Sequence, residues 1–149
     1  MKLSTRARYG TRALLDLALY SHQGPVQLRD IAHRQGISLS YLEHLVSPLI
    51  TAGLVRSTRG SRGGVQLARP PREIKLSEVV PLLEGELTLV DCVNNPAACT
   101  RSRLCATRDV WGEMSQAIAG VLATTTLQDL MERQRAKEAP GKTTGMYYI

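Results

Sequence analysis

The chain has 149 residues, 43% of them hydrophobic, a size and composition that fit one globular domain with an appended element. Residues 1–72 hold eleven basic and three acidic side chains (+8), whereas residues 73–149 hold eight basic and ten acidic ones (−2). The apolar runs are too short for a transmembrane span of about 20 residues. The basic half is typical of a surface that binds a polyanion such as DNA, with an anionic membrane as the competitor.

The first third of the chain has the pattern of a helix-turn-helix. No signal-peptide stretch opens the sequence, so we expect a cytoplasmic protein. Apolar residues at helical spacing then predict helices over residues 4–22, 28–35 and 38–53. Gly36 supplies the left-handed residue that ends many helices, and the turn that follows is short. Two helices joined by a short turn containing glycine form a helix-turn-helix.

A β-hairpin follows the third predicted helix. Residues 54–58 and 65–68 have the composition of two short strands, and residues 59–64 form a basic, glycine-rich turn between them. The expected fold is therefore mainly α-helical with a small β-hairpin wing, and a winged helix-turn-helix DNA-binding domain is expected over residues 1–72. Taken alone, the glycines could simply turn the hairpin while the arginines are solvated.

The third predicted helix is the candidate for reading DNA. Ser38 or Ser40 opens it, and Ser40 with Glu43 has the spacing of a capping box. The major groove admits one helix, whose first turn presents side chains to base edges, and an arginine-bearing wing suits the narrow minor groove. The expected DNA-binding residues are Ser38, Ser40, Tyr41, Glu43, His44, Arg59, Gly60 and Arg62.

The second half of the chain is expected to hold a sensor loop and a dimerisation helix over residues 73–135, with a flexible tail over residues 136–149. A short helix is predicted at 77–84, a long one at 107–124 and a last one after Thr126. The long helix carries the strongest apolar stripe and would overhang the preceding domain, which favours a homodimer. The stripe consists of Val110, Met114, Ala117, Ile118, Val121 and Leu122.

The chain has three cysteines, Cys92, Cys99 and Cys105. All of them fall between the predicted helices at 77–84 and 107–124. In a reducing compartment such a cluster indicates metal or redox chemistry more than structural disulfides. Their spacing suits a soft metal or an iron–sulfur cluster and lacks the close cysteine pairs of zinc sites, while inert thiols are the simpler alternative. No nucleophile–base pair or phosphate-binding loop is evident, which disfavours an enzyme.

The chain resembles the IscR-type winged-helix regulators, which are dimeric bacterial transcription factors that often carry a labile iron–sulfur cluster. The resemblance covers about residues 1–135. It rests on residues 1–4, 8–9, 13–18, 35–43 and 53–55, on Arg59-Gly60 and Gly63-Gly64, on the three cysteines, and on Trp111 and residues 126–130.

The resemblance implies a homodimer joined by the long helix, with the three cysteines ligating a cluster, 2Fe–2S favoured over 4Fe–4S. It also implies that Ser40, Glu43 and His44 read the major groove while Arg59 and the wing enter the minor groove. Two departures stand out. Arg108 occupies the place of the family's histidine, and Ser61-Arg62 replaces a Pro-Gly pair in the wing.

The fourth cluster ligand is therefore open among Asp91, Asp109 and a residue of the partner's first helix. Our hypothesis is a regulator that senses iron–sulfur status, oxidants or nitric oxide, in which the cluster orders the 92–105 loop. A cluster-free thiol switch is the first alternative. A small redox or electron-transfer protein with an incidental basic face is the second.

Overall fold

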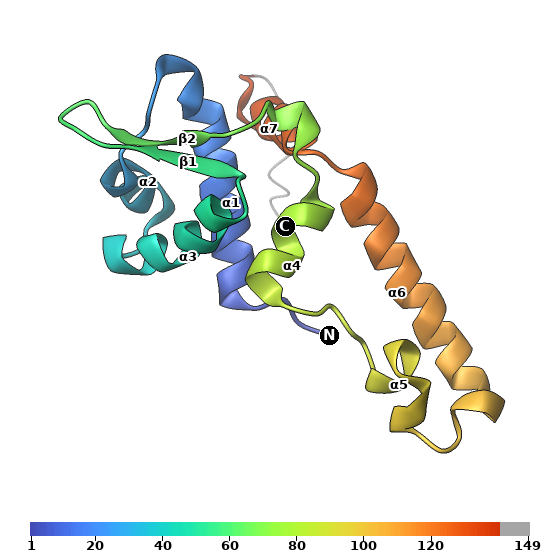
Figure 1. Cartoon of the computed structure of the whole chain (residues 1–149). Helices are drawn as coiled ribbons and strands as arrows, with labels where there is room; N and C mark the ends of the chain where they lie inside the picture. The colour runs from blue at the N-terminus through green and yellow to red at the C-terminus, as the bar shows by residue number, and fades with distance from the viewer. Residues whose placement is uncertain (141–149) are drawn as a thin grey trace, which may run out of the picture.

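The computed structural model describes residues 1–140, in which a helical body carries a β-hairpin on one side and a long helix that runs away from it (Figure 1). The α-helices are α1 (Thr5–Tyr20), α2 (Leu28–Gln35), α3 (Leu39–Thr51), α4 (Leu76–Glu84), α5 (Asp91–Asn94), α6 (Ala106–Thr124) and α7 (Leu127–Glu138). The strands are β1 (Val55–Thr58) and β2 (Gly64–Leu67), and single 3-10 turns lie at Ser21–Gln23, Pro71–Glu73, Pro96–Ala98 and Ser102–Leu104. The mainly α-helical fold with a hairpin wing is as predicted.

The helix-turn-helix forms as its local sequence dictates, with one correction at the third helix. Gly36 adopts a φ of 65° and ends α2, as predicted. The cap of α3 is Ser38, whose Oγ accepts a hydrogen bond from the backbone N–H of Tyr41 at 3.2 Å. Ser40 therefore lies inside the first turn, and the predicted capping box between Ser40 and Glu43 is wrong. The exposed Glu43 carboxylate is left available for other contacts.

The hairpin is antiparallel and is joined to the body by a third extended segment. Val55 pairs with Leu67, and Thr58 pairs with Gly64. On the other edge of β2, Val26 exchanges two backbone hydrogen bonds with Val65, each 2.8 Å long. The wing is thus tied to the chain between α1 and α2, which fixes it beside the helix-turn-helix.

The hydrophobic core is centred on α1 and crosses the predicted boundary at residue 72. Leu14 and Leu17 of α1 belong to one buried cluster that also contains side chains from α4 and α7. Gly10 lies so close to α4 that an added Cβ would stand 2.5 Å from Leu83 Cδ1. The α4 and α7 members of the core are Val79, Leu83, Leu127 and Met131. The predicted division into residues 1–72 and 73–135 therefore does not coincide with a break in packing.

The end of the described chain also departs from the prediction. Helix α7 is capped by Thr126, whose Oγ1 accepts from the backbone N–H of Asp129 at 3.1 Å and donates to the Asp129 carboxylate at 2.9 Å. The helix continues to Glu138, so residues 136–138 are helical and not part of a tail. The predicted flexible tail otherwise lies mostly at 141–149, outside the described residues.

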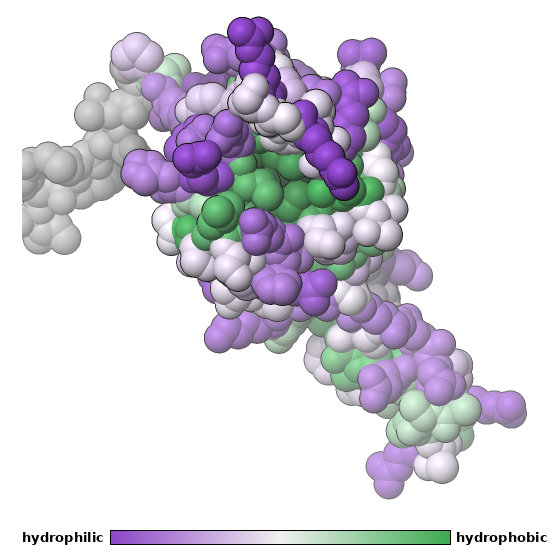
Figure 2. All heavy atoms as spheres, turned by 60° about the vertical axis from the view of Figure 1, so that its left-hand side comes forward, coloured by the Kyte–Doolittle hydropathy of each residue, from purple (hydrophilic) through white to green (hydrophobic). Residues whose placement is uncertain are grey.

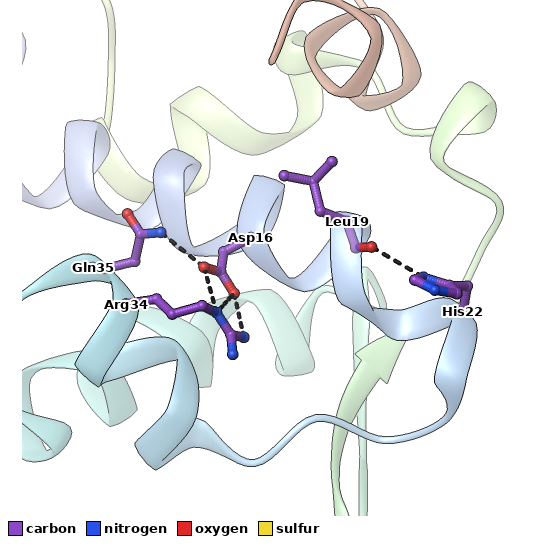
Figure 3. A network of polar contacts seen from close by, with 5 residues as sticks. All are labelled: Asp16, Leu19, His22, Arg34 and Gln35. Atoms are coloured by element: carbon purple, nitrogen blue, oxygen red, sulfur yellow. Dashed lines mark hydrogen bonds and ion pairs between the residues drawn. The ribbon is translucent and has the colours of Figure 1, made fainter. Parts of the chain in front are cut away.

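A buried carboxylate joins α1 to α2 (Figure 3). Asp16 is 4% exposed and receives hydrogen bonds from Arg34 at 2.7–3.1 Å and from Gln35 Nε2 at 2.9 Å. The Arg34 guanidinium also lies 4.0 Å from the ring centroid of Tyr20. The hydrogen bonds to Asp16 raise the pKa of Arg34 above its ordinary value. These contacts satisfy a charge that would otherwise be costly to bury.

The two halves of this ion pair should respond differently to substitution. Arg34→Met leaves the Asp16 carboxylate buried with Gln35 alone, and we expect a loss of about 3 kcal/mol in unfolding free energy. Asp16→Ala leaves an arginine whose side chain is 30% exposed and can turn to water, so we expect about 1–2 kcal/mol. Urea denaturation measures both values, with the exposed Arg29→Ala as control. Equal losses for the two variants would contradict this account.

Candidate nucleic-acid interface and cysteine loop

The first turn of α3 presents the polar side chains that the sequence singled out. Ser38, Ser40, Glu43 and His44 are exposed, while Leu42 beneath them is fully buried. Tyr41 is half-buried, because its ring packs edge-on against that of Tyr9 in α1, with centroids 6.3 Å apart. The predicted recognition residues therefore lie along one exposed end of the helix.

A groove runs between this end of α3 and the hairpin. Its lining includes Leu28 and Arg29 from α2, Leu39 and Glu43 from α3, and Arg59 and Gly60 from the wing tip. Figure 2, which turns this side of the molecule forward, shows an apolar area on the body surrounded by polar side chains. The structure thus brings predicted residues from two distant segments together. Arg62 is exposed at the wing tip but does not line the groove.

Arg29 and Leu39 are among the groove residues that the sequence analysis did not single out. Arg29 is an exposed cation on the first turn of α2, and its position beside a helix-turn-helix was the available signal. Leu39 is 43% exposed although it is in phase with the buried stripe of α3. Sequence periodicity could not reveal this exposure, because Leu39 lies on the first turn, beyond the edge of the core.

The wing tip needs glycine at several positions for steric reasons. Gly60 has a φ of 107°, which side chains rarely adopt. A Cβ at Gly63 would lie 2.1 Å from the Thr58 carbonyl oxygen, and one at Gly64 would lie 2.5 Å from that of Val26. The glycines therefore do turn the hairpin, and the tight tip leaves the Arg59 side chain exposed.

The three cysteines are spread along the segment between α4 and α6. Cys92 lies on α5 and is half-buried, Cys99 is exposed, and Cys105 caps α6 and is half-buried. Hydrogen bonding from the Thr107 hydroxyl, 3.1 Å away, and from the Arg108 backbone holds the pKa of the Cys105 thiol below its usual range. All three are free thiols.

The residues considered for the fourth ligand are arranged differently from the family pattern. Arg108 donates from Nε to the Cys92 carbonyl oxygen at 2.7 Å and from Nη2 to that of Val93 at 3.4 Å. Asp91 and Asp109 are exposed. Within residues 1–140, no three His, Cys, Asp or Glu side chains lie close enough together to hold a metal ion. Three soft sulfur donors on one loop fit an iron–sulfur cluster chemically, but their side chains are not gathered around a common point.

The sequence also matches a known protein family. The profile of the Rrf2 family, described as an iron-dependent transcriptional regulator, matches residues 3–133. The chain belongs to the Rrf2 family. Its resemblance to IscR-type regulators is confirmed, and it is a DNA-binding transcriptional regulator of this family.

Several relatives of this Rrf2 regulator cover nearly its whole length. Protein rrf2 of Nitratidesulfovibrio vulgaris is 47% identical over 88% of the chain and 87% of its own length. IscR of Photobacterium profundum is 40% identical over 95% of the chain and 82% of its own length. Among solved structures, T. potens IscR superposes with a TM-score of 0.74 at 40% identity, covering 99% of the chain and 97% of that structure. CymR, the global cysteine regulator of B. subtilis, gives 0.77 at 37% identity, covering 89% and 98%.

Helix α6 of this Rrf2 regulator has one apolar face that the described chain leaves open. Val110, Trp111, Met114 and Val121 are 39–64% exposed. The adjoining flank of the helix faces α4, where Ile118 and Leu122 are half-buried. The predicted apolar stripe is thus divided between a contact inside the chain and an open surface. No helix within residues 1–140 is long and apolar enough to cross a membrane.

Gly63→Ala should impair the wing and, with it, DNA binding by the Rrf2 regulator. The added Cβ would clash with the Thr58 carbonyl, so the tip must shift, and we expect a loss of about 1–3 kcal/mol confined to the hairpin. DNA affinity, measured by fluorescence anisotropy on a duplex selected from a random library, should fall about tenfold. Gly120→Ala, where an added Cβ meets nothing within 4 Å, is the matched control. Unchanged affinity for the Gly63→Ala variant would show that the wing does not contact DNA.

Proposed function

We propose that this Rrf2 regulator binds a DNA operator in the cytoplasm as a homodimer, and that sulfur chemistry at its three cysteines modulates that binding. The observation that carries the proposal is the path from the cysteine loop to the DNA-reading elements. The loop starts where α4 ends, and the Glu84 carboxylate there accepts from the backbone N–H of Ser4, the cap of α1, at 2.9 Å. A change in the loop therefore acts on α1, against which α3 packs.

The DNA-reading step uses the groove between α3 and the wing. Helix α3 enters the major groove, where Ser38, Ser40, Tyr41 and His44 contact phosphates or bases and Glu43 accepts from cytosine N4. Arg59, Gly60 and Arg62 at the wing tip approach the minor groove, whose negative potential attracts arginine. Two observations support this assignment. Glu43, Arg59 and Gly60 line one groove, and Ser38, Ser40, His44 and Arg62 are exposed.

Cys92, Cys99 and Cys105, with a fourth ligand from elsewhere, would hold an iron–sulfur cluster, 2Fe–2S in preference to 4Fe–4S. Such a cluster would supply a labile centre that responds to iron–sulfur status, oxidants or nitric oxide. Arg108 lacks a lone pair to donate, so it takes no part as a ligand. The controlled genes would be those of iron–sulfur cluster biogenesis or related stress. The donor chemistry and the IscR relatives support this assignment.

The cluster claim is tested by the visible absorption spectrum of the full-length protein purified without oxygen. We expect sulfur-to-iron charge-transfer bands that are lost in Cys92→Ser, Cys99→Ser and Cys105→Ser variants. Iron and acid-labile sulfide are measured on the same samples. Absence of the bands both after purification and after reconstitution would exclude the cluster.

A cluster-free thiol switch is the second candidate, and two observations favour it. Cys99 is exposed, and the pKa of Cys105 is lowered, both of which promote oxidation. One structural relative is the oxidized form of CymR from Staphylococcus aureus, at 40% identity and a TM-score of 0.73, covering 89% of this chain and 97% of that structure. A triple cysteine-to-serine variant that still switches its DNA binding would exclude both the thiol and the cluster mechanisms.

Glu43→Ala should relax sequence discrimination more than it lowers affinity. A carboxylate beside phosphates acts mainly by rejecting bases that cannot donate to it. We expect the affinity ratio between the selected operator and a site changed at the contacted cytosine to fall about tenfold. Arg56→Ala, which removes an exposed cation outside the recognition residues, is the control, because loss of general electrostatic attraction weakens binding to all sequences alike. Equal changes on every duplex for Glu43→Ala would count against the assignment.

The open face of α6 should form the dimer interface. Met114→Glu places a carboxylate in an apolar contact, where an unpaired charge costs several kcal/mol. The dimer dissociation constant, measured by sedimentation velocity, should rise about a hundredfold or more. Gln116→Glu, at an exposed polar position of the same helix, should leave it unchanged. A Met114→Glu variant that stays dimeric would place the interface elsewhere.

A further inference from the structure

The segment that bears the cysteines has a polar framework of its own. The buried Ser102 hydroxyl lies 2.6 Å from the carbonyl oxygens of both Pro96 and Cys99. Nearer the start of the loop, the Asn94 side-chain amide donates to Glu86 at 2.8 Å and to Thr88 at 3.1 Å. Hydrogen bonds from side chains of the segment itself therefore organise the loop.

Arg108 connects this framework to α6. Helix α5 is a single turn, so its last carbonyls have no partner within the helix. The Arg108 guanidinium provides that partner for Cys92 and Val93, at 2.7 and 3.4 Å, across about fifteen residues of chain. Charge-assisted hydrogen bonds are stronger than neutral ones, and the planar fork of arginine suits two adjacent acceptors. The Arg108 side chain is also half-buried between the two helices.

We propose that Arg108 is a positioning residue that anchors Cys92 to the first turn of α6. In the IscR-type regulators this position holds a histidine. In this chain it attaches the backbone of the cysteine loop to α6. The anchor fixes the backbone at Cys92 against α6 through contacts that involve no sulfur atom. The biological meaning rests on the proposed sensor function, whereas the anchor itself does not.

The test compares thiol access within one molecule. Full-length, reduced, cluster-free protein is treated with iodoacetamide, and labelling rates at Cys92 and Cys99 are measured by peptide mass spectrometry. We expect Arg108→Ala to raise the rate at half-buried Cys92 about tenfold, the factor expected for losing a charge-assisted hydrogen bond, and to leave exposed Cys99 unchanged. Loss of a nearby cation alone would slow thiolate labelling, so a rise identifies greater access.

Two further variants make the result decisive. Arg108→Lys keeps the charge and one donor, so it should give an intermediate rate at Cys92. Arg103→Ala removes an exposed arginine of the same segment and should behave as the unmodified protein. Unchanged labelling at Cys92 in both Arg108 variants would overturn the proposal, as would an equal rise at Cys99. Because no cluster is present, failure to find one spectroscopically leaves this outcome unaffected.

Discussion

The buried Asp16 carboxylate is the constraint on which the position of the recognition helix depends. A charge this deep in α1 has to be met by donors, and Arg34 and Gln35 at the end of α2 provide them. Only Gly36 and Ile37 separate those donors from Ser38, the cap of α3. The direction in which α3 leaves the turn is therefore constrained by a polar contact three residues before its cap.

Local patterns predicted the helices well and long-range packing poorly. The helical spacing of apolar residues in α1, α2, α3 and α6 is a local property of the sequence. The bounds of these helices were therefore predicted to within a few positions. The cap of α3 was ambiguous because Ser38 and Ser40 have equal propensity, and tertiary packing decides which one ends the extended segment. The boundary at residue 72 followed charge, which reports on partners, whereas the core joins residues across that boundary.

The candidate site was also predictable only in part. The exposed end of α3 and the wing tip were predictable because DNA readers share a few geometries that follow from groove dimensions. The cysteine loop was not, because its form depends on contacts between residues about fifteen positions apart. In the sequence, Arg108 is simply a missing ligand. In the structure it has a role, because its guanidinium bonds to backbone carbonyls that no sequence pattern marks.

The shared core also sets the order of events during synthesis. Leu127 is fully buried among side chains of the helix-turn-helix and α4, yet it is translated after all three cysteines. A nascent chain that ends before α7 lacks the residues that close this core, and its apolar faces stay open to water. The helix-turn-helix therefore completes its core only after the cysteine segment has been translated. A chain truncated before α7 would lack part of the core against which α1 packs.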